Sequence, residues 1–418
     1  MALPSLKMLW LYARFLVPRA WQVLCENIRS QIHKVTYRAV ENPKNIVVIG
    51  GSFGGVELTR KLASSLTTGY RVVLIEKNSH FNYTFNFPRY SVLEGHEHLA
   101  FIPYDGIAKS APAGIYRHVR GEASGITKDA VGLASGEEIP YEYLVMATGA
   151  TQRPPAKLLA SDLKGACAEL QGMQSLIKKA NTIAVIGGGA VGVELATDIK
   201  SYYPTKHVTL VHSHDRLLSR FKGNLHEEVL AALEKMEIEV LLKERPQLAP
   251  FKHNIDEELE QDKNQALTFS DGRVVPYDLV VSTLNKTPLA SDASYSSKKQ
   301  IPCTGQRPNS DLLAQIEPDV ISNSTGRILV QPTLQLANGK GAQAHSFALG
   351  DVAETEGPKM ARAAWYQAEV VRQNILALIK GQKPSTTYVP NMEVEGGLKL
   401  TLGKVRTICY NLASRHQC

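Results

Sequence analysis

Cysteine is scarce in this sequence, and its spacing fits neither disulfide pairing nor metal binding. The 418 residues include 5 cysteines, none of which forms a C-x-x-C or C-x-x-x-x-C motif. This scatter argues against a disulfide framework, a structural zinc site and a redox-active dithiol. We therefore predict no bound metal and a reducing compartment rather than secretion. The cysteines are Cys25, Cys167, Cys303, Cys409 and Cys418.

A strong net charge is also absent. Lysine and arginine total 47 against 40 acidic residues, which gives a net charge of +7, and the surplus forms no tight block. Such a weak, dispersed excess argues against nucleic-acid binding. It is compatible with phosphate-bearing cofactors or with anionic lipids.

The N-terminal segment, residues 1–43, lacks an apolar run long enough to cross a membrane, because Arg14 and Arg19 interrupt it. Basic residues alternate there with tryptophan and leucine, and Pro18 divides the segment into two short helical stretches. This pattern is typical of a membrane-surface helix or a mitochondrial targeting peptide. A helix that packs on the protein itself is the alternative. We expect a mitochondrial or membrane-associated cytoplasmic location.

From residue 44 onward, the chain repeats one supersecondary unit. Residues 45–76 have the pattern of a buried strand, a glycine turn, a helix and a second strand, and residues 181–212 repeat that order. A chain of this length requires more than one core. The duplicated βαβ unit predicts an α/β fold with two tandem Rossmann-like dinucleotide-binding domains. Further strands are expected near Tyr141, Tyr277 and His345, and the last helix from about Lys359 to Lys380.

The first glycine turn fits the pattern G-x-G-x-x-G with one substitution, because Ser52 takes the place of the middle glycine. Backbone N–H groups and the dipole of the following helix face a pyrophosphate at such a turn. At the end of the second strand, Glu76 is placed to accept hydrogen bonds from ribose hydroxyls. The predicted site residues are Gly50, Gly51, Ser52, Gly54, Gly55 and Glu76.

The second glycine turn contains all three glycines, Gly187, Gly189 and Gly192. Its second strand ends in His212, where a fold selective for NAD has an acidic residue. Histidine does not repel a 2′-phosphate, so we expect use of NADPH, or of both nucleotides, rather than strict use of NADH. A solvent-exposed His212 that only ends the strand is the alternative.

Two dinucleotide sites in one chain are explained most simply if one nucleotide is a flavin and the other brings hydride to it. The cofactors then carry out the chemistry. The sequence agrees, because it shows no Ser-His-Asp or Cys-His constellation for nucleophilic catalysis.

From about Asn45 to Lys383 the chain resembles FAD-dependent pyridine-nucleotide oxidoreductases of the AMID-like, apoptosis-inducing-factor-2 (ferroptosis-suppressor) type. It is more distantly similar to type II NADH dehydrogenases. Besides the two glycine turns, the resemblance rests on ATG at 147–149, CTGQRPN at 303–309 and LGDVAETEGPKMA at 349–361. It implies FAD and NAD(P)H as cofactors and a quinone-like electron acceptor.

The resemblance also implies roles for single residues. Asp351 would accept hydrogen bonds from the sugar part of FAD, and Thr148 and Gly149 would lie against the same nucleotide. Glu194 would face the nicotinamide, and Lys359 would lie near the flavin and the second substrate, where it could stabilise a developing negative charge. The alternatives are that Glu194 only stabilises the start of its helix and that Lys359 is a solvated charge.

The expected division of the chain follows from the repeats. We expect an FAD domain at 44–151 and 328–380, and a nicotinamide domain at 152–327. Residues 283–302 are polar and without periodicity, and they separate a strand from the CTGQRPN motif, so we interpret them as an insertion. The C-terminal region, 381–418, starts like the family's last strands and stops early, so the quinone site is expected to be incomplete.

These patterns predict an NAD(P)H-dependent flavoprotein that passes electrons to a quinone-like acceptor, with peripheral membrane contact through the N-terminal segment. Two other functions stay open. One is a soluble flavin oxidoreductase that acts on a small metabolite. The other is a signalling or nucleic-acid-binding flavoprotein with incidental turnover. A disulfide reductase is disfavoured, because no cysteine pair follows the first glycine turn.

Overall fold

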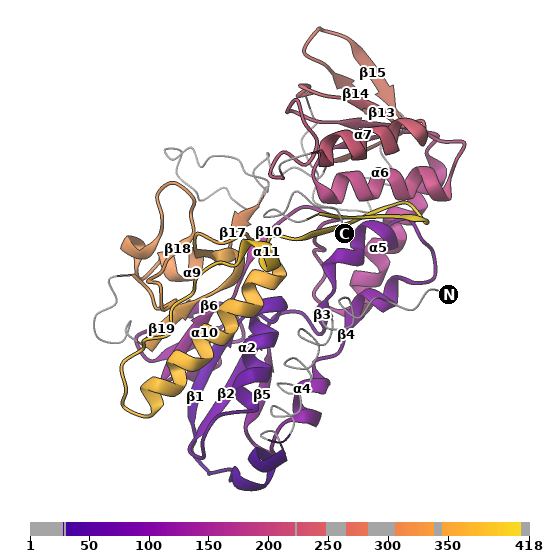
Figure 1. Cartoon of the computed structure of the whole chain (residues 1–418). Helices are drawn as coiled ribbons and strands as arrows, with labels where there is room; N and C mark the ends of the chain where they lie inside the picture. Colours follow the sequence, from indigo (N-terminus) through magenta and orange to yellow (C-terminus); the bar gives the residue numbers. More distant parts are fainter. Residues whose placement is uncertain are drawn as a thin grey trace, which may run out of the picture.

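The computed structural model describes Ile28 and residues 31–221, 224–247, 265–282, 306–337 and 345–410. It contains two α/β domains and a C-terminal hairpin (Figure 1). Most of the N-terminal segment and the whole insertion predicted at 283–302 lie outside the described residues. Within the described part of the chain, no helix is long and apolar enough to span a bilayer.

The first domain is built on a five-stranded parallel sheet. Its strand order is β19-β9-β1-β2-β5, and each neighbouring pair runs parallel. The runs of β-branched residues in the sequence form these strands, and alternate side chains point to opposite faces. The strands are β1 (Lys44–Ile49), β2 (Tyr70–Glu76), β5 (Tyr116–Arg120), β9 (Tyr143–Met146) and β19 (Ser346–Ala348).

Two apolar clusters place this sheet between two layers. On one face, Val48 belongs to a cluster that includes residues of helices α2 (Phe53–Ala63) and α10 (Ala361–Ile379). On the other face, Val47 belongs to a cluster shared with a three-stranded antiparallel layer. That layer consists of β6 (Ala123–Ile126), β7 (Ala130–Leu133) and β8 (Glu138–Pro140).

The second domain repeats the plan with a four-stranded parallel sheet of order β13-β12-β11-β16. Residues of helices α5, α6 and α7 pack into its main core. The predicted tandem Rossmann-like fold is therefore present in both halves. The elements are α5 (Leu163–Lys179), β11 (Thr182–Ile186), α6 (Ala190–Tyr202), β12 (His207–Val211), α7 (Leu225–Lys235), β13 (Glu239–Leu241) and β16 (Leu279–Ser282).

The chain crosses between the domains at a short antiparallel ladder of β10 (Ala150–Thr151) and β17 (Arg307–Pro308). Beyond β17, Leu313 and Val320 pack in a core cluster of the first domain. The chain has therefore returned to that domain before residue 328, earlier than the sequence analysis expects. The sequence does not mark this return, because helix α9 (Asp311–Ala314) is only 4 residues long and shows no periodicity.

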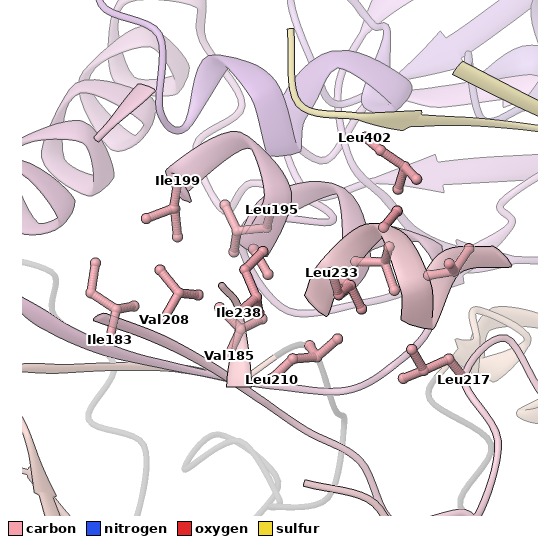
Figure 2. Packing of buried hydrophobic residues seen from close by; sticks show 14 of the residues in the cluster. Ile183, Val185, Leu195, Ile199, Val208, Leu210, Leu217, Leu233, Ile238 and Leu402 are labelled. Atoms are coloured by element: carbon pink, nitrogen blue, oxygen red, sulfur yellow. The ribbon is translucent and has the colours of Figure 1, made fainter. Parts of the chain in front are cut away.

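A hairpin of β21 (Leu398–Leu402) and β22 (Arg406–Tyr410) closes the described chain. It packs against α6, and Leu400 and Leu402 join the main core of the second domain. Figure 2 shows Leu402 on the same side of that core as Leu195 and Ile199 of α6. In Figure 1 the hairpin, in yellow, runs alongside α6. Residues 411–418 lie outside the described residues.

Short elements connect these layers. Strands β3 and β4 pair antiparallel after β2, and β14 and β15 form a second hairpin. The short elements are β3 (Phe81–Asn82), η1 (Thr84–Asn86), α3 (Phe87–Tyr90), η2 (Glu97–Ala100), β4 (Phe101–Ile102), α4 (Asp105–Ser110), β14 (Gln265–Thr268), β15 (Val274–Tyr277), η4 (Pro318–Val320), β18 (Ile328–Leu329), η6 (Gly350–Val352), β20 (Ala353–Glu354) and α11 (Met392–Glu395).

The packing predicts that Gly55→Ala destabilises the first domain. A Cβ built on Gly55 would lie 1.8 Å from the Gly50 carbonyl oxygen, so the start of α2 must move away from β1. We expect the free energy of unfolding to fall by about 3 kcal/mol, at the upper end of overpacking effects. Urea titration measures this change. Gly106→Ala is the control, since a Cβ there meets no atom within 4 Å. Equal stability of the two variants would contradict the packing.

Candidate functional site

Three parallel strands of the first sheet end at one edge, and each leads directly into a predicted site residue. Gly50 follows β1, Gly350 and Asp351 follow β19, and Thr148 comes two residues after β9. Ligands of open parallel sheets bind outside the carboxyl ends of the strands. The fold therefore brings the predicted residues for the first nucleotide to one edge, although they are far apart in the sequence.

The first glycine turn is closely packed beneath the position expected for a pyrophosphate. Gly50 has φ +103°, and a Cβ on it would lie 2.5 Å from the Ala147 carbonyl oxygen. A Cβ on Gly54 would lie 2.4 Å from Leu349 Cδ1. Together with Gly55, these glycines let α2 start directly against two strands. Its N-terminal backbone N–H groups therefore point along the edge where phosphate binds.

The serine in the first turn is compatible with this geometry. Ser52 is the N-cap of α2, has φ −86°, and is exposed. The corresponding residue of the second turn, Gly189, caps α6 with φ −82°, and a Cβ there would meet no atom within 4 Å. A side chain fits at this position of either turn. The serine therefore leaves the backbone geometry of the turn unchanged.

Glu76 lies against the first turn rather than in open solvent. It is 8% exposed, and its Oε2 accepts a hydrogen bond from Gly51 N at 2.5 Å. Its Oε1 accepts from the Asn78 backbone N at 2.8 Å. Tyr104 Oη donates to the Gly51 carbonyl at 2.7 Å and closes the other side of the turn. These contacts hold the carboxylate at the position where the fold binds a ribose.

Thr148 and Gly149 are fixed by a residue from the far end of the inserted domain. Thr148 Oγ1 donates to the Asn309 carbonyl at 2.6 Å, and Asn309 Nδ2 donates to the Thr148 carbonyl at 2.9 Å. The Asn309 backbone N also donates to the Gly149 carbonyl at 2.9 Å. Asn309 ends the CTGQRPN motif, which by itself does not indicate a function for this residue. The structure shows that it fixes the loop after β9.

Lys157 was missed by sequence reasoning. Its Nζ donates a hydrogen bond to the Ala150 carbonyl, and a Cβ built on Gly149 would lie 4.0 Å from it. Burial lowers the pKa of Lys157, whereas the carboxylates of Asp351 and Glu76 raise it. Lys157 is half-buried, and its ammonium lies in the field of these two carboxylates, a setting suited to a phosphate-bearing ligand. Nothing in the local pattern PPAK predicts that position, because the loop between the domains folds it back.

Asp351 and Lys359 are neighbours at this edge. Lys359 Nζ donates to the Ala353 carbonyl at 2.8 Å and to Thr355 Oγ1 at 2.8 Å. Burial and the positive charge of Arg327 lower the pKa of Lys359, the carboxylates of Glu354 and Asp351 oppose this shift, and the net pKa is about 8. The lysine is half-buried, so the alternative of a freely solvated charge does not apply.

The second glycine turn reproduces the first with different chemistry. Gly187 has φ +122°, and His212 Nδ1 accepts a hydrogen bond from Gly188 N at 3.1 Å, as Glu76 accepts from Gly51. His212 is 8% exposed, so it does not simply end the strand in solvent. Burial lowers the pKa of His212, and His214 and His226 act in the same direction. Because Nδ1 accepts the Gly188 N–H it carries no proton, so the ring in this contact is neutral. Gly192 is buried within α6.

Glu194 is half-buried on α6 and contacts the C-terminal hairpin. Its Oε1 accepts hydrogen bonds from Thr401 N and from Thr401 Oγ1, each at 2.9 Å. Burial raises the pKa of Glu194, the bonds from Thr401 oppose this, Asp198 raises the pKa and Arg89 lowers it. Neither this contact nor the position of Arg89 could be predicted from the sequence, because both depend on how the hairpin and α3 meet α6.

A family model described as pyridine nucleotide-disulphide oxidoreductase matches residues 44–368. The chain belongs to this family. The match covers both glycine turns as well as Asp351 and Lys359. Membership confirms the predicted fold class and the predicted cofactors, FAD and NAD(P)H, and makes the chain an NAD(P)H-dependent oxidoreductase. Residues 77–90 contain no cysteine, so a cysteine pair does not follow the first turn.

The relatives extend over nearly the whole chain. Fe-regulated protein 8 of Mycosarcoma maydis is 32% identical over 393 residues, covering 88% of this chain and 89% of the relative. Ferroptosis suppressor protein 1 of Homo sapiens is 28% identical over 350 residues, covering 83% of each chain. These similarities confirm the resemblance to the apoptosis-inducing-factor-2 type.

Solved structures agree on the fold. A ferredoxin reductase from Rhodopseudomonas palustris aligns with a TM-score of 0.63 at 20% identity, over 88% of this chain and 81% of that chain. NDH2 from Plasmodium falciparum in complex with NADH aligns with a TM-score of 0.62 at 13% identity, over 90% of this chain and 91% of that chain. At these identities the alignments establish the architecture.

The geometry predicts that Lys157→Met weakens FAD binding. Removal of the Lys157 ammonium takes away a charged donor at the edge near Gly149 and Asp351, and we expect about tenfold weaker binding. Titration of the apoprotein with FAD, followed by flavin fluorescence, measures the dissociation constant. Lys128→Met is the matched control, since Lys128 is exposed on the antiparallel layer. Wild-type affinity in Lys157→Met would remove this residue from the site.

Proposed function

We propose that this chain takes reducing equivalents from NADH or NADPH and delivers them to a quinone-like acceptor. Bound FAD supplies the step between a two-electron hydride donor and the acceptor. The observation that carries the proposal is the edge of the first sheet. There the first glycine turn and half-buried Lys157, two features suited to phosphate, lie at the same edge as Lys359, whose pKa is about 8.

The absence of a thiol pair favours an external acceptor. Members of the family with a redox-active disulfide pass electrons to cysteines near the flavin, and here residues 77–90 offer none. This chain aligns with 83% of the length of human ferroptosis suppressor protein 1 and with 87% of the length of apoptosis-inducing factor homolog B of Dictyostelium discoideum. An overall activity shared with these relatives is therefore the simplest proposal for this chain. The electrons then leave the flavin for an external acceptor and not for a pair of cysteines in the protein.

Lys359 has a defined task in this proposal. It is held by carbonyl and hydroxyl acceptors on the β20 turn, so its ammonium stays at the start of α10. A half-buried cation stabilises negative charge that develops on a nearby oxygen far better than a solvated one. Because the pKa is about 8, the group carries its charge at neutral pH and can also release a proton there.

His212 suits both nicotinamide nucleotides. A neutral ring neither repels a 2′-phosphate nor offers the carboxylate that selects for NADH. Its hydrogen bond from Gly188 N keeps the ring close to the second turn. We therefore propose that NADPH is used alongside NADH.

A visible spectrum tests the proposal directly. The FAD-loaded protein should lose its flavin absorption when it is titrated anaerobically with NADH or NADPH, and menadione or ubiquinone should restore it. Flavin that is reduced but restored only by small polar metabolites would favour a soluble metabolite reductase. Flavin that no acceptor restores, together with salt-sensitive DNA binding, would favour the signalling function. Flavin that neither nucleotide reduces would contradict the proposal.

The charge of Lys359 predicts a pH dependence. The ammonium is protonated below pH 8 and loses its charge as the pH rises through about 8, so quinone reduction by the FAD-loaded enzyme should fall across that range. Lys359→Arg should keep its activity above pH 9, because guanidinium remains charged. Lys359→Met should reduce the rate about 100-fold at neutral pH. A flat profile in the wild type would show that this charge is not used.

The location follows from the same proposal. A quinone-like acceptor is apolar, and the basic N-terminal segment, residues 1–43, has the composition of a membrane-surface helix. We propose contact with a mitochondrial or other cytoplasm-facing membrane. Flotation with anionic liposomes, comparing the full chain with one that starts at residue 31, tests this. Equal recovery of both chains with the liposomes would oppose it.

A further inference from the structure

Glu194 and Thr401 form a contact between α6 and the C-terminal hairpin. Both donors of Thr401, its backbone N–H and its hydroxyl, bind the same oxygen of Glu194, Oε1, at 2.9 Å each. Among the described residues, Oε2 accepts no hydrogen bond. The carboxylate is therefore fixed through one oxygen, while the other stays available.

The hairpin that supplies Thr401 is firmly attached to the second domain. Leu400 and Leu402, on either side of Thr401, are 0% and 2% exposed in the core that contains α6. Lys404 N donates to Ser201 Oγ at 3.1 Å, at the last turn of α6. Thr401 therefore cannot move far from Glu194 without opening this core.

Arg89 strengthens the same attachment. Its Nη2 donates to Asp198 Oδ1 at 2.8 Å and to the Gly403 carbonyl at 2.7 Å. Asp198 is 1% exposed, so its charge needs this partner. The guanidinium joins α3 of the first domain, α6 of the second and the turn of the hairpin.

The Glu194 side chain leans toward the second glycine turn. Side chains on an α-helix lean toward its N-terminus, and Glu194 is the fifth residue of α6, whose N-cap is Gly189. The end of β21 away from Thr401 lies at the first domain. There the guanidinium of Arg362, in α10, donates a hydrogen bond to the carbonyl of Gly397, the residue before β21. Four residues of extended strand span about 13 Å. The hairpin thus brings Glu194 close to the start of α10, which follows Lys359.

We propose that Thr401 is a positioning residue for the nicotinamide. It holds Oε1 of Glu194, so that Oε2 is presented to the amide of the bound nicotinamide and the carboxylate does not rotate into solvent. This inference rests on the proposed function, since it assumes that a nicotinamide nucleotide binds over the second glycine turn. It gives the C-terminal hairpin a function in hydride donation as well as in packing.

Three variants separate positioning from packing. Thr401→Val keeps the shape and the backbone donor but removes the hydroxyl, and Thr401→Ser restores the hydroxyl. Thr407→Val is the matched control, because Thr407 pairs with Thr401 across the hairpin and is exposed. All three variants keep a side chain suited to a strand, so the hairpin should remain folded.

The first readout needs no nicotinamide. The pKa of the Glu194 carboxyl is measured by 13C NMR in FAD-loaded, 13C-glutamate-labelled protein, with Glu194→Gln to assign the signal. Loss of a donor to the carboxylate raises its pKa. Thr401→Val should therefore raise this pKa above the wild-type value, whereas Thr401→Ser and Thr407→Val should leave it unchanged. An unchanged pKa in Thr401→Val would overturn the proposal.

The second readout is nucleotide binding. Thr401→Val should bind NADH about five- to tenfold more weakly, as expected for loss of one hydrogen bond to a charged group. In a Glu194→Gln background the same substitution should have little further effect, since interacting residues are not additive. Full additivity of the two changes would overturn the proposal. If neither nucleotide reduces the wild type, the proposed function fails instead, and this inference fails with it.

Discussion

The structure depends on the close contact between the first glycine turn and the two strands beside it. A Cβ on Gly50 would collide with the Ala147 carbonyl, in the loop after β9, and a Cβ on Gly55, at the start of α2, would collide with the Gly50 carbonyl. This contact aligns the carboxyl ends of β1, β9 and β19 at one edge. Asp351, Thr148 and Lys157 lie at the edge where we propose that FAD binds.

The second domain repeats one hydrogen bond of the first turn with a different side chain. In each domain the residue at the end of the second strand accepts a hydrogen bond from the turn, Glu76 from Gly51 and His212 from Gly188. Backbone geometry is thus repeated while the chemistry changes from a carboxylate to a neutral imidazole.

Much of this arrangement could be predicted from the sequence. The glycine turns, Glu76 and the parallel strands follow from local patterns, and the family confirms the fold and cofactors that they indicate. Lys157, Asn309 and Thr401 could not be predicted. Each acts across a long separation in sequence, in loops or a hairpin whose position depends on packing. The return of the chain before residue 328 was missed for a similar reason, since α9 is too short to show periodicity.

The central claim is that two nucleotides meet between the two sheets, with the C-terminal hairpin beside them. A crystal structure of the protein loaded with FAD and NAD⁺ tests it most directly. We expect FAD along the edge formed by Ser52, Lys157 and Asp351, and the nicotinamide between this FAD and Oε2 of Glu194, with Thr401 still bound to Oε1. A nicotinamide bound elsewhere, or a hairpin displaced from α6 by the nucleotide, would contradict it.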